Sequence, residues 1–403
     1  MRVAFLPGSF RPDRCGVSHY TAHLMDALRF RGVQCSVMTT QAAAEHHQRG
    51  EVMGGTVGWG PGMLLSLPGA IRRLNPDILH IQHAAGSFDF RRAVFWLPQA
   101  LRAAGWRGPI VVTLHEYGWW EWKGPLWKSL GPWGEKHGMW DREDFGLLVG
   151  ANKIIVTHDG ALRTLVSRLP QLSGRVAQVP IGPNIPLLAT NREMARAALR
   201  ARFGWPHDTP IISYFGFVHP VKGIETLLRA FARVLAAYPQ ARLLLNGGIH
   251  SLALHDNQAL QYQQKLQRLI GELGLDNAVR LTGYQPDSII SQHLSGADVG
   301  VLPFNDGVTL KSGSLLAMWS HGLPVVATRP AVSPPELDRA CRLVPSRSPE
   351  ALADALAKLL ADPDARRELG ERAQAAAAAY SWETIAERHL EIYQAISNRR
   401  EHG

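Results

Sequence analysis

The stretch from Pro210 to Phe231 constrains the fold of this chain more than any other. Its apolar run Ile211–Phe215 predicts a short buried strand, and the apolar residues after the turn recur at helical spacing. The turn between them, Gly216–Gly223, carries His219 and Lys222. A strand, a turn and a helix in this order bind anions at the helix N-terminus, where unpaired N–H groups and the helix dipole favour negative charge. Lys222 adds a full positive charge at that position.

Length and composition indicate a folded protein of two domains. A chain of 403 residues is too long for one hydrophobic core. Its hydrophobic fraction of 46% and charged fraction of 19% are typical of a globular protein and exclude a disordered one. The net charge of +9 favours phosphate-bearing ligands or an anionic membrane surface. Because the basic residues form no dense tract, nucleic acid is not an expected partner.

The three cysteines, Cys15, Cys35 and Cys341, are odd in number and lack metal-ligand spacing. This usage is typical of a reducing compartment. We find no signal peptide and no apolar run of 18 residues, so we expect no segment that crosses a membrane. The expected location is therefore cytoplasmic, with the inner membrane face as a candidate peripheral surface.

Short apolar runs alternate with helical segments through both halves of the chain. In the first half, strands are expected at Arg2–Leu6, Gln34–Thr39, Asp77–Gln82, Ile110–Leu114, Lys153–Val156 and Val176–Val179. In the second half, they are expected at Ile211–Phe215, Arg242–Asn246, Val279–Thr282 and Ala297–Leu302. The glycine-containing stretches 7–18 and 54–62 are expected to be loops. Proline is dense between Pro180 and Pro186, and this stiff segment is the best candidate for a linker.

Polar residues follow two expected strands directly. His83 comes after the strand that ends at Gln82, and His115 and Glu116 come after Leu114. Ligands gather at the carboxyl edges of open α/β sheets, so these three residues are candidate site residues. Gly16, in the first loop, would let the backbone approach a ligand closely.

Six of the twelve tryptophans fall between Trp119 and Trp140, interleaved with lysines. An indole has an apolar body and one N–H donor, which suits stacking on sugar rings or lying at a bilayer surface. The neighbouring lysines favour anionic lipid. We interpret residues 117–144 as an insertion that binds acceptor or membrane through Trp119, Trp120 and Trp122. Packing of these aromatic side chains against their own domain is the alternative.

The pattern Gly-x-x-x-x-x-Lys-Gly at 216–223, the segment RCGVSHYTAHL at 14–24, TLHEY at 113–117 and ADVGVLPF at 297–304 resemble the family 4 glycosyltransferases. This resemblance implies an α/β fold of the GT-B type, with two facing Rossmann-like domains built on parallel sheets. The implied domains are 1–183, the acceptor domain with its insertion 117–144, and 184–380, the donor domain. The C-terminal helix, 381–403, is expected to cross back onto the first domain.

The same resemblance implies roles for individual residues. Residues expected to bind the donor are Gly16, Gly216, His219, Lys222, Gly247, Tyr284, Thr309, Lys311, Ser312, Gly313, Ser314 and Leu315. Residues expected at the reacting sugar or its leaving group are His115, Lys222 and Asp306. Residues expected to bind the acceptor are His83, Glu116, Trp119, Trp120 and Trp122. No cofactor is expected, since the nucleotide sugar is a substrate, and no metal site is expected.

The chain departs from the family pattern at two places. The family's arginine before the turn lysine is absent, and His219 stands nearest to that position. The family's paired glutamates are also absent, because alignment on Gly322–Val325 places Thr309 and Ala317 where they would stand. The segment 311–314 still forms a glycine-containing turn before a helix, with an added lysine. Diphosphate binding is therefore expected to persist, with Asp306 as the nearest carboxylate for the sugar.

The resemblance implies a retaining transfer of a sugar from a nucleoside diphosphate to a glycan, a lipid-linked acceptor or a small molecule. The positive charge and the Trp/Lys insertion favour cell-envelope polysaccharide or glycoconjugate synthesis. Two alternatives remain: a nucleotide-binding scaffold that has lost catalysis, and a sugar-nucleotide epimerase of the same architecture. A dinucleotide oxidoreductase is excluded, because no G-x-G-x-x-G follows any expected strand.

Overall fold

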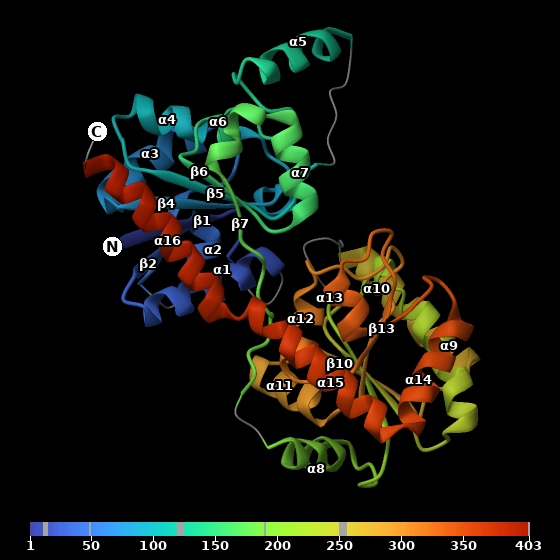
Figure 1. The fold of residues 1–403 in the computed structure, drawn as a ribbon. Helices are drawn as coiled ribbons and strands as arrows, with labels where there is room; N and C mark the ends of the chain where they lie inside the picture. The colour runs from blue at the N-terminus through green and yellow to red at the C-terminus, as the bar shows by residue number, and fades with distance from the viewer. Residues whose placement is uncertain (11–14, 48–49, 119–124, 189–190, 250–255, 402–403) are drawn as a thin grey trace. The chain divides into compact units, whose positions relative to one another are not determined.

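The computed structural model describes residues 1–403 except 11–14, 48–49, 119–124, 189–190, 250–255 and 402–403. The chain divides into two compact units (Figure 1). Unit 1 consists of Met1–Ile181 and Trp382–Gly403, and unit 2 consists of Gly182–Ser381. The first boundary therefore falls inside the proline-dense segment 180–186. We describe each unit by itself.

Within the described residues, unit 1 is built on a seven-stranded sheet in the order β3-β2-β1-β4-β5-β6-β7, with all neighbours parallel. The strands are β1 (Arg2–Pro7), β2 (Gln34–Thr40), β3 (Val52–Thr56), β4 (Ile78–His83), β5 (Ile110–Leu114), β6 (Lys153–Val156) and β7 (Val176–Gln178). The helices are α1 (Gly16–Phe30), α2 (Gln41–Ala44), α3 (Met63–Leu74), α4 (Leu97–Ala103), α5 (Pro125–Lys136), α6 (Gly146–Val149), α7 (Asp159–Arg168) and α16 (Trp382–Glu401), with short 3-10 turns at Ala85–Phe88, Ala93–Trp96 and Pro170–Arg175.

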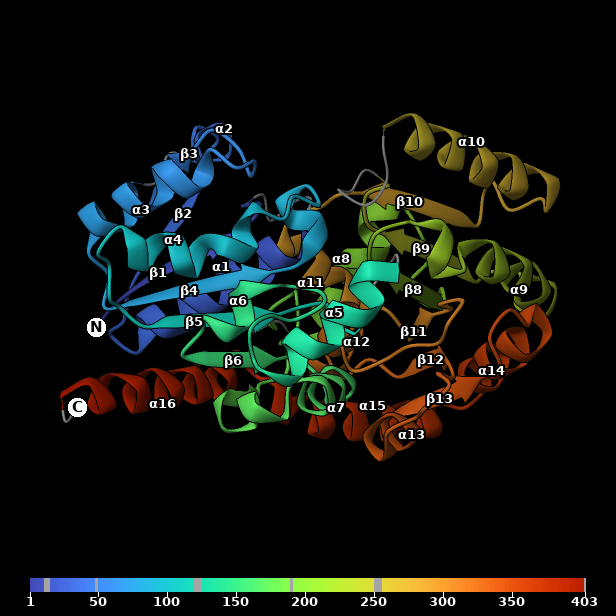
Figure 2. The same ribbon diagram turned by 90° about the horizontal axis from the view of Figure 1, so that it is seen from above.

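The C-terminal helix α16 packs on unit 1 beside α1 (Figures 1 and 2). Arg31, just after α1, donates to Glu387 of α16 at 2.6 Å. Deeper in the interface, the fully buried Tyr393 reaches His80 of β4. The expected return of the last helix to the first domain is therefore confirmed.

Within the described residues, unit 2 is built on a six-stranded parallel sheet in the order β10-β9-β8-β11-β12-β13. The strands are β8 (Ile211–Phe215), β9 (Arg242–Asn246), β10 (Val279–Gly283), β11 (Val299–Leu302), β12 (Val325–Thr328) and β13 (Cys341–Val344). The helices are α8 (Arg192–Phe203), α9 (Ile224–Ala237), α10 (Asp256–Glu272), α11 (Asp287–Gly296), α12 (Gly313–Ser320), α13 (Pro335–Ala340), α14 (Pro349–Ala361) and α15 (Pro363–Ala377), with 3-10 turns at Pro220–Lys222 and Ala378–Tyr380.

Strands β5 and β8, in the middle of the two sheets, are shielded from water along their whole length. Every residue of β5 and β8 is buried. A parallel sheet is covered by helices on both faces, as Figures 1 and 2 show for each unit, so neither face of a central strand meets water. The expected fold class, two Rossmann-like domains with parallel sheets, is confirmed.

A buried ion network joins helix α8 to the centre of the unit 2 sheet. Asp298, just before β11, accepts hydrogen bonds from the Arg200 guanidinium at 2.8 Å and from the Ile211 amide at 2.8 Å. Arg196 also pairs with this carboxylate. Asp298 and Arg200 are both almost fully buried, so each charge depends on the other.

Two loop predictions were wrong. The first loop was expected to extend to Ser18, whereas α1 already begins at Gly16. The stretch 54–62 was expected to be a loop, but Gly54 lies in strand β3. A Cβ atom at Gly54 would lie 2.7 Å from the Cα of Gln41, so glycine serves close packing there rather than a turn.

In the part of the chain that the structure describes, none of the helices combines the length and apolar character needed to span a membrane.

Candidate active site

The turn after β8 lies against helix α12 and against the loop that follows β11. Gly216 has a φ of +142°, and a Cβ atom there would lie 3.0 Å from the Ser314 hydroxyl oxygen. At the other end of the turn, Gly223 has a φ of +68°, and its Cβ would lie 2.0 Å from the Pro303 carbonyl oxygen. Side chains are therefore disfavoured at both positions. The carboxyl edges of β8 and β11 and the first turn of α12 consequently surround one location.

Helix α12 presents its N-terminus at this location. Ser312 caps the helix, because its hydroxyl accepts from the Leu315 amide at 3.3 Å. The Ser312 amide itself donates to the Thr309 carbonyl at 3.0 Å, which closes the preceding turn. By position, the first amides of a helix lack partners within it, and the dipole places positive charge beside them. This end of α12 can accept an anion.

Lys222 lies at the same edge. Its Nζ atom is 3.7 Å from the centre of the Phe304 ring, on the loop after β11. Burial lowers the pKa of Lys222 to about 8, since the surroundings disfavour a charged amine. Asn305 fixes the lysine's turn by donating from its side chain to the Pro220 carbonyl at 3.0 Å. A phosphate bound beside Lys222 would favour the charged amine again.

Three other residues predicted to bind the donor lie in the loops after β8, β9 and β10. The imidazole Nδ1 of His219 accepts from the Val221 amide at 3.3 Å, so the ring caps the turn. Gly247, after β9, forms a bridge with Gly283. Tyr284 follows that glycine with 55% of its surface exposed, as a stacking residue requires.

The two positions where the family places its glutamates lie in the loop before α12 and inside α12 itself. Ala317 is fully buried inside α12, so this position offers no polar group. Thr309 is exposed, and its hydroxyl accepts from the Lys311 amide at 3.4 Å. Asp306 is exposed next to Asn305, which contacts the lysine's turn. The role of Asp306 at the sugar stays a prediction.

In unit 1, His115 follows β5 and is held from two sides. Its amide donates to the His83 carbonyl at 2.9 Å, and its Nε2 lies 2.8 Å from the Gln82 side-chain oxygen. The Tyr20 ring of α1 meets the imidazole edge-on, with ring centres 4.8 Å apart. Glu116, the next residue, is exposed.

A buried polar chain continues beneath His115. The Gln82 amide nitrogen lies 3.2 Å from His80 Nε2, and His80 Nδ1 lies 2.6 Å from the Tyr393 hydroxyl. Burial lowers the pKa of His80 well below its ordinary value, so its ring is neutral and carries one donor and one acceptor. With the Gln82 nitrogen directed at His80, its oxygen accepts from His115 Nε2–H. The hydrogen bonds thus define the orientation and tautomer of His115.

The sequence analysis did not predict this series of hydrogen-bonded side chains, although the strand pattern contained a sign of it. In the expected strand 77–82, His80 and Gln82 occupy alternate positions. Two polar side chains on the same face of a buried strand need partners, and the C-terminal helix supplies one of them.

His83 has a different environment from the one predicted. It is 3% exposed and packs against Phe88 and Phe95. Its Nδ1 lies 3.6 Å from an oxygen of the buried Asp144. Burial lowers the pKa of His83 to about 4, and burial with nearby carboxylates raises that of Asp144 well above its ordinary range. His83 therefore lies beneath the surface, and its contact with an acceptor stays a prediction.

The remaining predicted site residues are the tryptophans of the insertion and Gly16, and the structure describes only some of them. Trp119, Trp120 and Trp122 lie outside the described residues. Further along the insertion, Trp133 has 51% of its surface exposed. Gly16 is the exposed first residue of α1.

Two family models match the chain, one in each half. The model described as Glycosyltransferase Family 4 matches residues 15–185, and the model described as Glycosyl transferases group 1 matches residues 209–362. The chain belongs to the family 4 type of GT-B glycosyltransferases. This glycosyltransferase is therefore an enzyme of sugar transfer, which argues against the scaffold and epimerase alternatives.

Individual proteins agree with this assignment. The glycosyltransferase is 27% identical to the D-inositol 3-phosphate glycosyltransferase of Kineococcus radiotolerans, across 96% of this chain and 92% of that protein. Its fold resembles HepE of Anabaena in complex with UDP and glucose, with a TM-score of 0.70, 18% identity and coverage of 98% and 100%. It also resembles the sucrose-phosphate synthase of Thermosynechococcus elongatus, with a TM-score of 0.71, 22% identity and coverage of 98% and 99%.

Proposed function

We propose that the enzyme binds the diphosphate of a nucleoside diphosphate sugar at the carboxyl edge of the unit 2 sheet. The observation that carries this proposal is the approach of Gly216 to Ser314, which brings the β8 turn and the α12 N-terminus together. Lys222 belongs to the same turn, and Lys311 precedes the same helix. Amides at a helix N-terminus with lysines beside them are the donors that a diphosphate requires.

These groups also act on the chemical step. Transfer breaks the bond between the anomeric carbon and the β-phosphate oxygen, and negative charge develops on the departing diphosphate. Lys222 and the first amides of α12 stabilise that charge in fixed positions. An acceptor hydroxyl forms the new bond to the anomeric carbon and gives its proton to the departing diphosphate. Asp306 contacts the sugar in place of the family's glutamates, and Tyr284 stacks on the base.

His115 faces the transferred sugar in this proposal, as the family resemblance implies. Its Nε2–H is donated to Gln82, so Nδ1 is the unprotonated ring nitrogen. Gly16 begins α1, whose Tyr20 contacts the His115 ring.

The acceptor is a hydroxyl compound of the cell envelope, either a glycan or a lipid-linked sugar. Glu116 and the tryptophans of the insertion bind it, and the positive charge of the chain favours an anionic membrane surface. The similarity to D-inositol 3-phosphate glycosyltransferases supports a phosphorylated polyol as a second acceptor class. The two classes are distinguished by supplying each with the donor and measuring nucleotide release.

The donor is identified by thermal unfolding with UDP, GDP, ADP and their sugars. A ligand that binds only the native state raises stability by RT ln(1 + [L]/Kd), which is about 2.7 kcal/mol at 100 Kd. We expect one nucleoside diphosphate and its sugar to raise the Tm by several degrees, because each kcal/mol of added unfolding free energy shifts the Tm of a domain by about 2–4 °C. The matching nucleoside monophosphate should give a smaller shift. Equal shifts with nucleosides that lack phosphate would contradict a site built for a diphosphate.

The hydrogen bond that His115 Nε2–H donates to the Gln82 side-chain oxygen predicts a coupled loss of activity. Gln82→Leu should lower kcat about tenfold, as expected for one lost orienting hydrogen bond, with the donor KM changed less than about twofold. His115→Ala should lower kcat at least as much. The double variant should then be no worse than His115→Ala alone, because both changes remove one interaction. Additive losses would show that Gln82 acts independently of His115.

A further inference from the structure

A pocket of about 720 Å³ opens where α13, β13, α14 and α15 meet in unit 2. Its floor includes the buried side chains of Leu359 and Leu369 and that of Cys341. Its basic lining residues come from all four elements: Arg339, Arg342, Lys358 and Arg372. We call it the amino-edge pocket.

The four basic side chains are all exposed, and within the described part of the chain none of them makes a hydrogen bond or an ion pair. The two acidic lining residues are already engaged. Asp338 accepts from Arg329 at 2.7 Å, and Asp362 accepts from the Ala365 amide at 2.9 Å as the cap of α15. Four positive and two negative side chains line the pocket, so its lining has a net positive charge.

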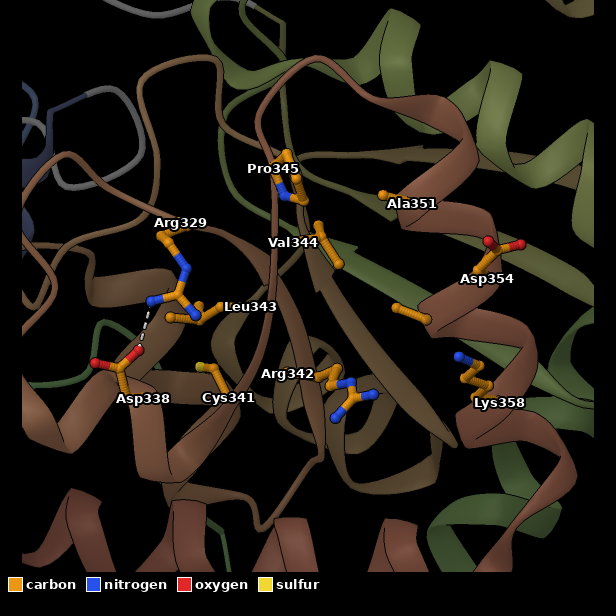
Figure 3. A pocket seen from close by; sticks show the side chains of 11 residues that line it. Arg329, Asp338, Cys341, Arg342, Leu343, Val344, Pro345, Ala351, Asp354 and Lys358 are labelled. Atoms are coloured by element: carbon orange, nitrogen blue, oxygen red, sulfur yellow. Dashed lines mark hydrogen bonds and ion pairs between the residues drawn. The ribbon is translucent and has the colours of Figure 1, made fainter.

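Figure 3 shows the adjoining hollow between β13 and α14, which has a volume of about 400 Å³. Arg342 and Lys358 line both the hollow and the amino-edge pocket. In Figure 3 they extend from β13 and α14 on opposite sides of this space, and the dashed line marks the bond that occupies Asp338. The two cations can therefore act on one ligand.

We propose that the amino-edge pocket binds a phosphate group with two or more negative charges. Four neighbouring cations repel one another, and an anion with a single charge would neutralise only part of that charge. Arginine has a planar fork of N–H donors that fits phosphate oxygens in pairs, whereas lysine supplies a point charge. The phosphate is carried either by a soluble molecule or by a lipid headgroup.

The amino-edge pocket is separate from the proposed donor site. In a parallel sheet all strands begin at one edge and end at the other. Arg339 and Cys341 stand where β13 begins, and the end of α14 lines the pocket from Lys358 to Ala361. The donor residues follow the ends of β8 and β11, at the opposite edge of the sheet. This inference therefore does not depend on the proposed donor.

Inorganic pyrophosphate is the probe for a soluble ligand, titrated calorimetrically into the full chain. The pocket variant is Arg342→Gln/Lys358→Gln/Arg372→Gln. A matched control, Arg202→Gln/Arg229→Gln/Arg268→Gln, removes the same charge from exposed positions of unit 2 outside the pocket. Both variants are also made with Lys222→Ala, which removes the proposed donor contribution. Vesicles of phosphatidylglycerol, compared with phosphatidylcholine, are the probe for a lipid headgroup.

We expect the pocket variant to weaken binding of one probe at least about tenfold, since each lost arginine or lysine removes a charge-assisted hydrogen bond. The control variant should change the affinity for that probe less than about twofold, whether or not it also carries Lys222→Ala. Loss of pyrophosphate binding identifies a soluble ligand, and loss of vesicle binding alone identifies a lipid. Equal weakening by both triple variants, or no binding of either probe, would overturn the proposal. The basic residues would then serve only to protect the exposed edge of β13.

Discussion

Replacing Lys222 by alanine is expected to lower kcat/KM by about 10²–10³-fold, which is the usual cost of one lost donor to a developing negative charge. Lys222 is proposed to face the departing diphosphate, and its amine rests on the Phe304 ring rather than on a carboxylate. The measurement is nucleotide release under initial-rate conditions. The Tm of the variant should stay close to that of the parent, because Lys222 makes no ion pair within the described residues.

The pKa of Lys222 gives this prediction a second readout. The protonated amine binds the diphosphate, and burial lowers its pKa to about 8 in the unliganded protein. Donor affinity should therefore be full below pH 8 and should fall as the pH rises above it. Lys222→Arg keeps its charge in this range, so its affinity should not fall there. A loss above pH 8 that is identical in Lys222→Arg would assign the titration to another group.

Replacing Asp298 by alanine is expected to destabilise unit 2 by about 3–5 kcal/mol, the usual cost of removing one partner of a buried ion pair. The Arg200 guanidinium would keep its positive charge in a buried place, and the Ile211 amide would lose its acceptor. Amide hydrogen exchange in β8 and β11 measures the free energy of opening for unit 2 alone.

Glu350→Ala is the matched control for this prediction. It also removes a carboxylate from an arginine, Arg233 at 3.2 Å, but both side chains are largely exposed. Exposed pairs contribute about 0–1 kcal/mol, so exchange should barely change. If Asp298→Ala were as mild as Glu350→Ala, the network would not support the sheet as described.

The sequence predicted those parts of the fold that depend on local pattern. The run Ile211–Phe215 was expected to be a buried strand, because it is mostly apolar and too short for a helix. Strand β5 was expected at its observed bounds, Ile110–Leu114. Strand β3 was missed because glycine at position 54 is typical of a turn. The reason for the glycine is the close approach of the Gln41 backbone, which the sequence does not show.

Only part of the candidate site could be predicted from the sequence. Lys222 lies in the loop after β8, and the α12 N-terminus ends the loop after β11, so parallel topology places both at one edge of the sheet. The contact of Tyr393 with His80 spans 313 positions, and the amino-edge pocket joins four elements by tertiary packing. No local pattern carries such information. The burial of His83 behind Phe88 and Phe95 was hidden from the sequence for the same reason.

The most direct test of the account is a crystal structure of the enzyme with the nucleoside diphosphate that stabilises it most. We predict phosphate oxygens within about 3 Å of Lys222 Nζ and of the first amides of α12, beside Gly216. A diphosphate bound away from this edge, with Lys222 still resting on Phe304 alone, would contradict the account.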